Sequence, residues 1–186
     1  MTGRRLLGPR LLGAVLAGGQ SRRFGSDKAL AVLDGQTLLE RAVARLAGWC
    51  DEVVVIGRAE APAPVVADWP RPGMGPLGGI AGALRHASAG GFDAVLTAGV
   101  DSLSLPDDLP ARLGEGPTYV TDQPVVALWP VAVLPALEAI LTAEGRHAVR
   151  DLIAASGAKA VALPGASANV NTPEDLARLA GDQGPN

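Results

Sequence analysis

The sequence predicts an α/β fold in which a mostly parallel sheet is covered by helices on both faces. Short apolar runs alternate along the chain with segments of helical periodicity, and Gly and Pro residues separate the two kinds of segment. The runs are apolar on both faces, as strands are when helices pack on both sides of a parallel sheet. With 186 residues, of which 48% are hydrophobic, the chain can bury one sizeable core, so we expect a single domain over residues 1–186.

Seven runs rich in Val, Leu and Ala are the predicted strands. The start of the chain, MTGRRLLGPRLLGAVLAGG, resembles a secretory signal, but Arg10 interrupts its apolar run, and a glycine loop with two more arginines follows Leu11 to Ala17. We therefore expect a strand there rather than a removed leader. In chain order the runs are Leu11 to Ala17, Glu52 to Ile56, Val65 to Ala67, Ala94 to Ala98, Tyr119 to Thr121, Val125 to Trp129 and Ala160 to Leu163.

Helical periodicity predicts five helices between and after these strands. The first begins at Thr37, which forms a capping box with Glu40 ahead of apolar residues at i, i+3 and i+4 spacing. The last begins at Thr172, with Pro173 at the first helical position. The others are expected from Leu77 to Ala87, through Leu134, Leu137 and Leu141, and through Val149, Leu152 and Ile153.

The composition argues against several classes of partner. Lys and Arg number 16 against 19 Asp and Glu, and the net charge of −3 does not suit a protein that binds the nucleic-acid backbone. Aromatic residues make up 3% of the chain, which leaves few rings for stacking on bases. No apolar stretch approaches the roughly 20 residues that span a bilayer. We therefore expect neither a nucleic acid nor a membrane as a partner.

Cys50 is the single cysteine, which rules out an internal disulfide and a Cys-rich zinc site. This pattern favours a reducing compartment, and we expect the protein in the cytoplasm. Cys50 itself is interpreted as a small buried apolar residue.

Ligands of open parallel sheets bind beyond the carboxyl ends of the strands. That rule selects the loops Gly18 to Lys28, Asp68 to Gly79 and Gly99 to Pro106. The first loop belongs to the sequence LAGGQSRRFGSDK, which begins at Leu16. Its glycines allow backbone amides to approach a ligand, and its basic and hydroxyl side chains suit a polyphosphate. Its spacing fits neither familiar phosphate loop, and a solvated glycine turn with surface arginines is the alternative.

Four segments in order resemble the nucleotidyltransferases of the nucleotide-sugar transferase fold. They are the run L-A-G-G-x-S-x-R-x-G-x-D-K, Asp68 followed by GPLGGIAGAL, VDSLSLPDDL around Asp101, and NVNTPEDL from Asn169. Within that group the chain is most similar to the molybdenum cofactor guanylyltransferases, of which the last segment is the more particular mark.

The resemblance implies a three-layer α/β/α, Rossmann-like nucleotidyltransferase fold and a Mg²⁺-dependent reaction. GMP would pass from GTP to the terminal phosphate of molybdopterin, with release of pyrophosphate. Residues 11–110 would form the nucleotide-binding half and residues 111–186 the acceptor-binding half. Lys28 would meet the triphosphate, Asp101 would hold the metal, and both would be catalytic. The other implied nucleotide-binding residues are Leu16, Ala17, Gly18, Gly19, Ser21, Arg22 and Asp68, and the acceptor-binding candidates are Asn169 and Asn171.

This chemistry needs no general base, because a phosphate monoester with a second pKa near ~6 is already largely ionised at neutral pH. The two histidines, His86 and His147, lie outside the candidate loops. Simpler roles remain open: Asp101 as a cap or turn residue, Asp68 as the edge of a Pro/Gly loop, and Asn169 and Asn171 as turn residues.

Two departures from the family pattern bear on substrate choice. Gly57 follows the second strand where relatives commonly carry an asparagine near the nucleotide, and the segment 114–130 looks compressed. Alternatives are a cytidylyltransferase of the same cofactor, a transferase for another phosphorylated acceptor, and a nucleotide-binding module without catalysis. Protein partners, if any, would be other cofactor-biosynthesis proteins or molybdoenzymes.

Overall fold

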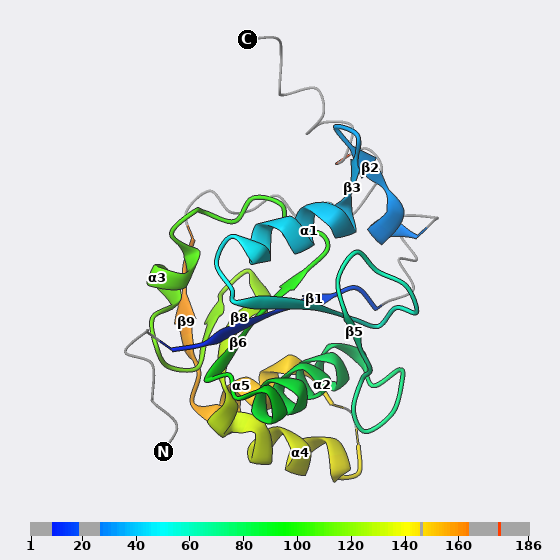
Figure 1. Cartoon of the computed structure of the whole chain (residues 1–186). Coiled ribbons are helices and arrows are strands. Elements are labelled where there is room, and N and C mark those ends of the chain that lie inside the picture. Colours follow the sequence, from blue (N-terminus) through cyan, green and yellow to red (C-terminus); the bar gives the residue numbers. More distant parts are fainter. Residues whose placement is uncertain (1–8, 19–26, 146, 164–174, 176–186) are drawn as a thin grey trace, which may run out of the picture.

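A computed structural model describes residues 9–18, 27–145, 147–163 and 175 (Figure 1). Its main sheet has seven strands in the order β5-β4-β1-β6-β8-β7-β9. Only β8 runs antiparallel to its neighbours in this sheet, and the other strands share one direction. The strands are β1 (Leu11–Leu16), β4 (Glu52–Ile56), β5 (Val65–Val66), β6 (Ala94–Gly99), β7 (Thr118–Val120), β8 (Gln123–Pro130) and β9 (Lys159–Val161).

Helices cover both faces of this sheet, which confirms the predicted three-layer α/β/α fold. Helix α1 (Leu38–Ala47) lies on one face, and α2 (Gly75–Gly90), α4 (Leu134–Thr142) and α5 (Val149–Ser156) lie on the other (Figure 1). The short helix α3 (Leu109–Leu113) follows β6. Residues of β1 alternate between the two layers: Leu12 and Ala14 pack in the core beneath α2, and Val15 packs in the core beneath α1.

All seven predicted strands and the four predicted helices within the described residues are present. Thr37 and Glu40 form the predicted capping box, with the Glu40 amide donating to the Thr37 hydroxyl at 3.1 Å and the Thr37 amide donating to the Glu40 carboxylate at 2.7 Å. The helix predicted from Thr172 lies outside the described residues.

A small second sheet, formed by residues that lie between β1 and α1 in the chain, was not predicted. Strands β2 (Val32–Leu33) and β3 (Gln36–Thr37) form a hairpin around Asp34 and Gly35, both of which have positive φ angles. An Asp-Gly pair is a strong signal for such a tight turn, so the sequence did carry this information. The 3₁₀ helices η1 (Lys28–Leu30) and η2 (Val131–Val133) were also missed, because three residues are too few to show a period.

Helix α2 packs closely on the backbone that leaves β5. A Cβ atom on Gly82 would lie 2.1 Å from the Ala67 carbonyl oxygen, and one on Gly78 would lie 3.5 Å from the Cβ of Asp68. The glycines of GPLGGIAGAL therefore let this helix approach the loop that carries Asp68. In the described part of the chain, no helix combines the length and the apolar character needed to cross a membrane.

Candidate active site

The loops predicted to bind a ligand leave the sheet at one edge. Because every strand of the main sheet except β8 runs the same way, six carboxyl ends lie together, and we call this edge the rim. The rim is formed by Leu16, Ile56, Val66, Gly99, Val120 and Val161.

The residues after β1 lie directly against the residues after β4. The Ala17 amide donates to the Ile56 carbonyl at 3.0 Å, which extends the pairing of the two strands. Gly57 has a φ of +83°, and a Cβ atom built on it would lie 2.5 Å from the Cα of Gly18. Both glycines are therefore needed for the two backbones to meet at the rim. Leu16, Ala17 and Gly18 lie at this contact.

Lys28 and Asp101, two of the predicted site residues, meet across the rim. The Lys28 ammonium (Nζ) lies 2.9 Å from Oδ2 of Asp101, and the two side chains are 10% and 27% exposed. Residues 73 positions apart thus form a charge-assisted hydrogen bond in a partly buried setting, where it is stronger than it would be in water. The pair places an ammonium group, of the kind that binds phosphate oxygens, beside a carboxylate, of the kind that binds hard metal ions.

Each partner is positioned by its own short element. Lys28 opens η1, and Asp27 caps that element by accepting a hydrogen bond from the Ala29 amide at 3.1 Å. Asp101 follows β6 by two residues and folds back over Gly99, where a Cβ atom would lie 2.4 Å from Oδ1 of Asp101. Gly99 therefore leaves the space that the Asp101 carboxylate occupies.

Asp27 also forms a bidentate ion pair with Arg58, which the sequence did not predict. The Arg58 nitrogens Nη1 and Nη2 lie 3.0 and 2.7 Å from Oδ1 and Oδ2 of Asp27, respectively. These hydrogen bonds hold the pKa of the Asp27 carboxyl below its usual range and raise the pKa of Arg58. The D-K pair of the first motif contains Asp27, but nothing near Arg58 in the sequence indicates a partner 31 positions away.

Ser102 is the second residue that sequence reasoning missed. Its hydroxyl is buried and has no hydrogen-bond partner among the described residues, and it lies 3.7 Å from the point where a Gly99 Cβ would be. The Asp101 carboxylate and the Ser102 hydroxyl are thus two hard oxygen donors beside one glycine. Such donors suit Mg²⁺, which takes one or two carboxylates and keeps several waters. Among the described residues, no group of three or more His, Cys, Asp or Glu side chains is placed to hold a metal.

Asp68 is held within its own loop rather than joined to the Lys28–Asp101 pair. Its carboxylate (Oδ2) accepts a hydrogen bond from the Gly73 amide at 3.3 Å. This contact matches the simpler reading of Asp68 as the edge of a Pro/Gly loop, while its place after β5 keeps it at the rim.

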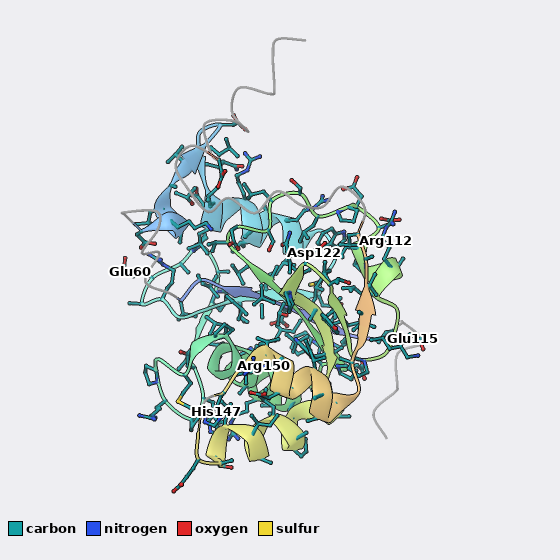
Figure 2. All side chains as sticks on the ribbon, turned by 180° about the vertical axis from the view of Figure 1, so that it is seen from behind. Glu60, Arg112, Glu115, Asp122, His147 and Arg150 are labelled. Carbon is teal, nitrogen blue, oxygen red and sulfur yellow. The ribbon has the colours of Figure 1, made fainter. Side chains whose placement is uncertain are left out.

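Five of the predicted site residues lie outside the described part of the chain: Gly19, Ser21, Arg22, Asn169 and Asn171. Their flanks are described. Gly18 and Asp27 border the first group, and β9 ends at the rim before the second group. Figure 2 shows His147 beside the helices that cover the α2 face of the sheet. This agrees with the expectation that His147 lies outside the candidate loops.

Comparison with known proteins identifies the family. A model described as the MobA-like NTP transferase domain matches residues 13–161. A molybdenum cofactor guanylyltransferase from Acidiphilium cryptum is 38% identical over 184 residues, which cover 91% of this chain and 93% of that protein. The protein of the same name from Cereibacter sphaeroides is 40% identical over 187 residues, which cover 91% and 95% of the two chains.

Solved structures share the fold. Molybdopterin-guanine dinucleotide biosynthesis protein A from Archaeoglobus fulgidus superposes with a TM-score of 0.73 at 22% identity, covering 92% of this chain and 97% of that one. A 2-C-methyl-D-erythritol 4-phosphate cytidylyltransferase from Thermus thermophilus gives a TM-score of 0.66 at 18% identity, covering 90% and 96%. With matches along almost its whole length, the chain belongs to the molybdenum cofactor guanylyltransferases, nucleotidyltransferases of the MobA-like NTP transferase family.

Proposed function

We propose that the protein transfers GMP from GTP to the terminal phosphate of molybdopterin, with release of pyrophosphate. The observation that carries this proposal is the Lys28–Asp101 pair at the rim, 2.9 Å apart and mostly buried. A metal-bound triphosphate matches both side chains, because its phosphate oxygens can bind Lys28 and its metal ion can bind Asp101. The names of the relatives supply the identities of the nucleotide and the acceptor.

In this proposal the nucleotide lies against the backbones of Leu16, Ala17 and Gly18. Lys28 turns its ammonium from Asp101 to the triphosphate oxygens and offsets charge on the leaving pyrophosphate. Asp101 holds Mg²⁺, which when bound neutralises phosphate charge and helps to align the reacting groups. The further nucleotide-binding candidates are Gly19, Ser21, Arg22 and Asp68.

The acceptor phosphate attacks without help from a base on the protein, because it is already largely ionised at neutral pH. The main task is then to hold two anions in line. We assign the acceptor to residues 111–186, with Asn169 and Asn171 as contacts, and the nucleotide to residues 11–110. The single cysteine supports the cytoplasm as the place of reaction.

The direct test supplies each ribonucleoside triphosphate in turn, with Mg²⁺ and molybdopterin, and measures pyrophosphate. We expect release with GTP, and a fall of about a hundredfold or more in the Asp101→Asn variant, as when one preorganised charge contact is removed. Arg112→Gln is the matched control, since its ion pair with Asp108 is exposed on α3. Release with CTP but not GTP would overturn the base assignment, and undiminished turnover in Asp101→Asn would remove that residue from the mechanism.

A further inference from the structure

The ion pair between Asp27 and Arg58 joins two loops of the rim. Arg58 follows β4, and its side chain is 17% exposed, whereas the Asp27 side chain is 45% exposed. Isolated ion pairs at a surface contribute little, but a pair with two parallel hydrogen bonds fixes the relative orientation of both groups. This contact therefore restrains where Asp27 lies relative to the end of β4.

Asp27 also restrains the position of Lys28, the next residue in the chain. Besides binding Arg58, its carboxylate accepts from the Ala29 amide at 3.1 Å and so fixes the start of η1, whose first residue is Lys28. Ala29 is buried in the core beneath α1, which holds the other side of the short helix. The ammonium of Lys28 then reaches Asp101 at 2.9 Å. Arg58, Asp27, Lys28 and Asp101 form one continuous chain of contacts.

The residue before Arg58 packs closely against another loop of the rim. Arg58 follows Gly57, whose Cα faces the backbone of Gly18 so closely that a Cβ atom there would lie 2.6 Å from the Gly18 nitrogen. Two consecutive residues after β4 thus contact Gly18 on one side and Asp27 on the other. The geometry gives Arg58 a fixed base from which to hold Asp27.

We propose that Arg58 is a positioning residue, which through Asp27 sets the place of Lys28 for the nucleotide's triphosphate. This inference rests on the proposed function. It differs from a direct role, in which Arg58 would leave Asp27 and bind the nucleotide itself.

Asp27→Asn separates the two roles. Asparagine can still cap η1, since its side-chain oxygen accepts from the Ala29 amide, but it has no charge to hold Arg58. The variants to compare are Arg58→Gln, Asp27→Asn and the double variant, with Arg112→Gln as the control. Figure 2 shows Arg112 on the opposite side of the molecule from Glu60, which lies in the same loop as Arg58. The control thus removes an exposed Asp–Arg ion pair, made by a single hydrogen bond, far from the site.

We expect each single variant to raise the KM for GTP and the calorimetric Kd for Mg·GTP by about tenfold, the scale on which small displacements of a positioned group act. The KM for molybdopterin should not change. The double variant should be no worse than either single one, because both changes remove the same contact. Loss of folded protein alone would lower kcat with both KM values unchanged, so this division of effects excludes a purely structural role.

A direct role predicts a different result: Asp27→Asn would leave the affinity for Mg·GTP unchanged or increase it, and that outcome overturns the proposal. Unchanged affinity in Arg58→Gln overturns it as well. Amide hydrogen exchange of residues 28–33 without nucleotide is a separate readout, which should be faster in Arg58→Gln than in the wild type. If the wild-type protein binds no Mg·GTP while this exchange still accelerates, the proposed function fails rather than the contact between Arg58 and η1.

Discussion

Lys28 carries a positive charge in a place with little access to water, and Asp101 is the partner that makes this tolerable. A buried charge without a partner is costly, whereas pairing and hydrogen bonding offset much of that cost. The same pair presents a positive and a negative group at the rim. In the proposed function, each group would leave its partner and bind a group of opposite charge on the metal-bound substrate. Stability of the free protein and the proposed recognition of a triphosphate therefore depend on the same two side chains.

Cys50 illustrates a residue whose surroundings suppress its chemistry. Burial, and secondarily the nearby charge of Asp51, raise the pKa of its thiol from 9.0 to about 12. Since the thiolate is the reactive form, its fraction at about pH 8 falls by roughly a thousandfold relative to a free thiol. We expect a thiol reagent such as DTNB to label the folded protein very slowly and the urea-unfolded protein rapidly.

A Cys50→Ser variant, which should show no labelling, identifies the reacting group. Equally rapid labelling of the folded protein would contradict the partial burial of Cys50 against Gly13 of β1.

The sequence predicts Lys28 and Asp101 as site residues, because each lies in a family-like motif that follows a predicted strand of a parallel sheet. Arg58 and Ser102 could not be found in the same way. The partner of Arg58 is on another loop, and the burial of the Ser102 hydroxyl depends on how the chain folds back over Gly99. Contacts made by loops across the rim have no periodic signal in the chain.

At the scale of elements, helix α2 depends on close approach to the strand before it. Gly82→Ala would place a methyl group 2.1 Å from the Ala67 carbonyl oxygen, so the helix or the loop after β5 must move. We expect the free energy of unfolding to fall by about 1–3 kcal/mol, the usual cost of overpacking. Urea denaturation followed by circular dichroism measures this change.

Gly48→Ala at the end of α1 is the matched control. Gly48 has an ordinary helical φ of −71°, and an added Cβ atom would lie 3.4 Å from the Arg45 carbonyl oxygen. That variant should be neutral or more stable by about 0.4–1 kcal/mol, because alanine restricts the unfolded chain. Equal effects of the two substitutions would show that crowding at Ala67 is not the cause.

Elements were predictable to the extent that a period or a cap marks them. The long apolar runs and the Thr37 capping box predicted strands and helices within a few residues of where they lie. Strand β8 extends beyond its predicted bounds, because Gln123 and Pro130 pair at its ends although neither favours a strand. The ends of β8 are therefore set by pairing with the neighbouring strands and not by the strand preference of the local sequence.

For the whole molecule, the shifted pKa values predict a window of pH in which the fold is most stable. Hydrogen bonds lower the pKa of Asp27 (from Arg58), of Glu40 (from Thr37) and of Asp108 (from Arg112). These groups bind protons more weakly in the folded than in the unfolded chain. Their stabilising effect is complete above their ordinary values of 3.8 and 4.5 and is lost as the pH falls through the lower folded values.

Cys50 sets the alkaline side of the window. Its folded pKa is raised, so stability falls as the pH rises from 9.0 towards about 12, where only the unfolded thiol ionises. Urea midpoints measured across this range should form a plateau with both limbs declining. Asp27→Asn should make the decline of the urea midpoint at acid pH shallower, and Cys50→Ser should do the same at alkaline pH. If these variants leave the two declines unchanged, other groups cause them.

The reversal of β8 has a consequence for how such enzymes diverge. The turn at Thr121 and Asp122 is only two residues long and stands at the rim, above a β7–β8 ladder whose register shifts between Tyr119 and Val120. An insertion at this point would add chain above the sheet without shifting the register of β6, whose end leads to Asp101. On the proposed division of the chain, lengthening this hairpin would therefore add residues on the acceptor side and leave the Lys28–Asp101 pair unchanged.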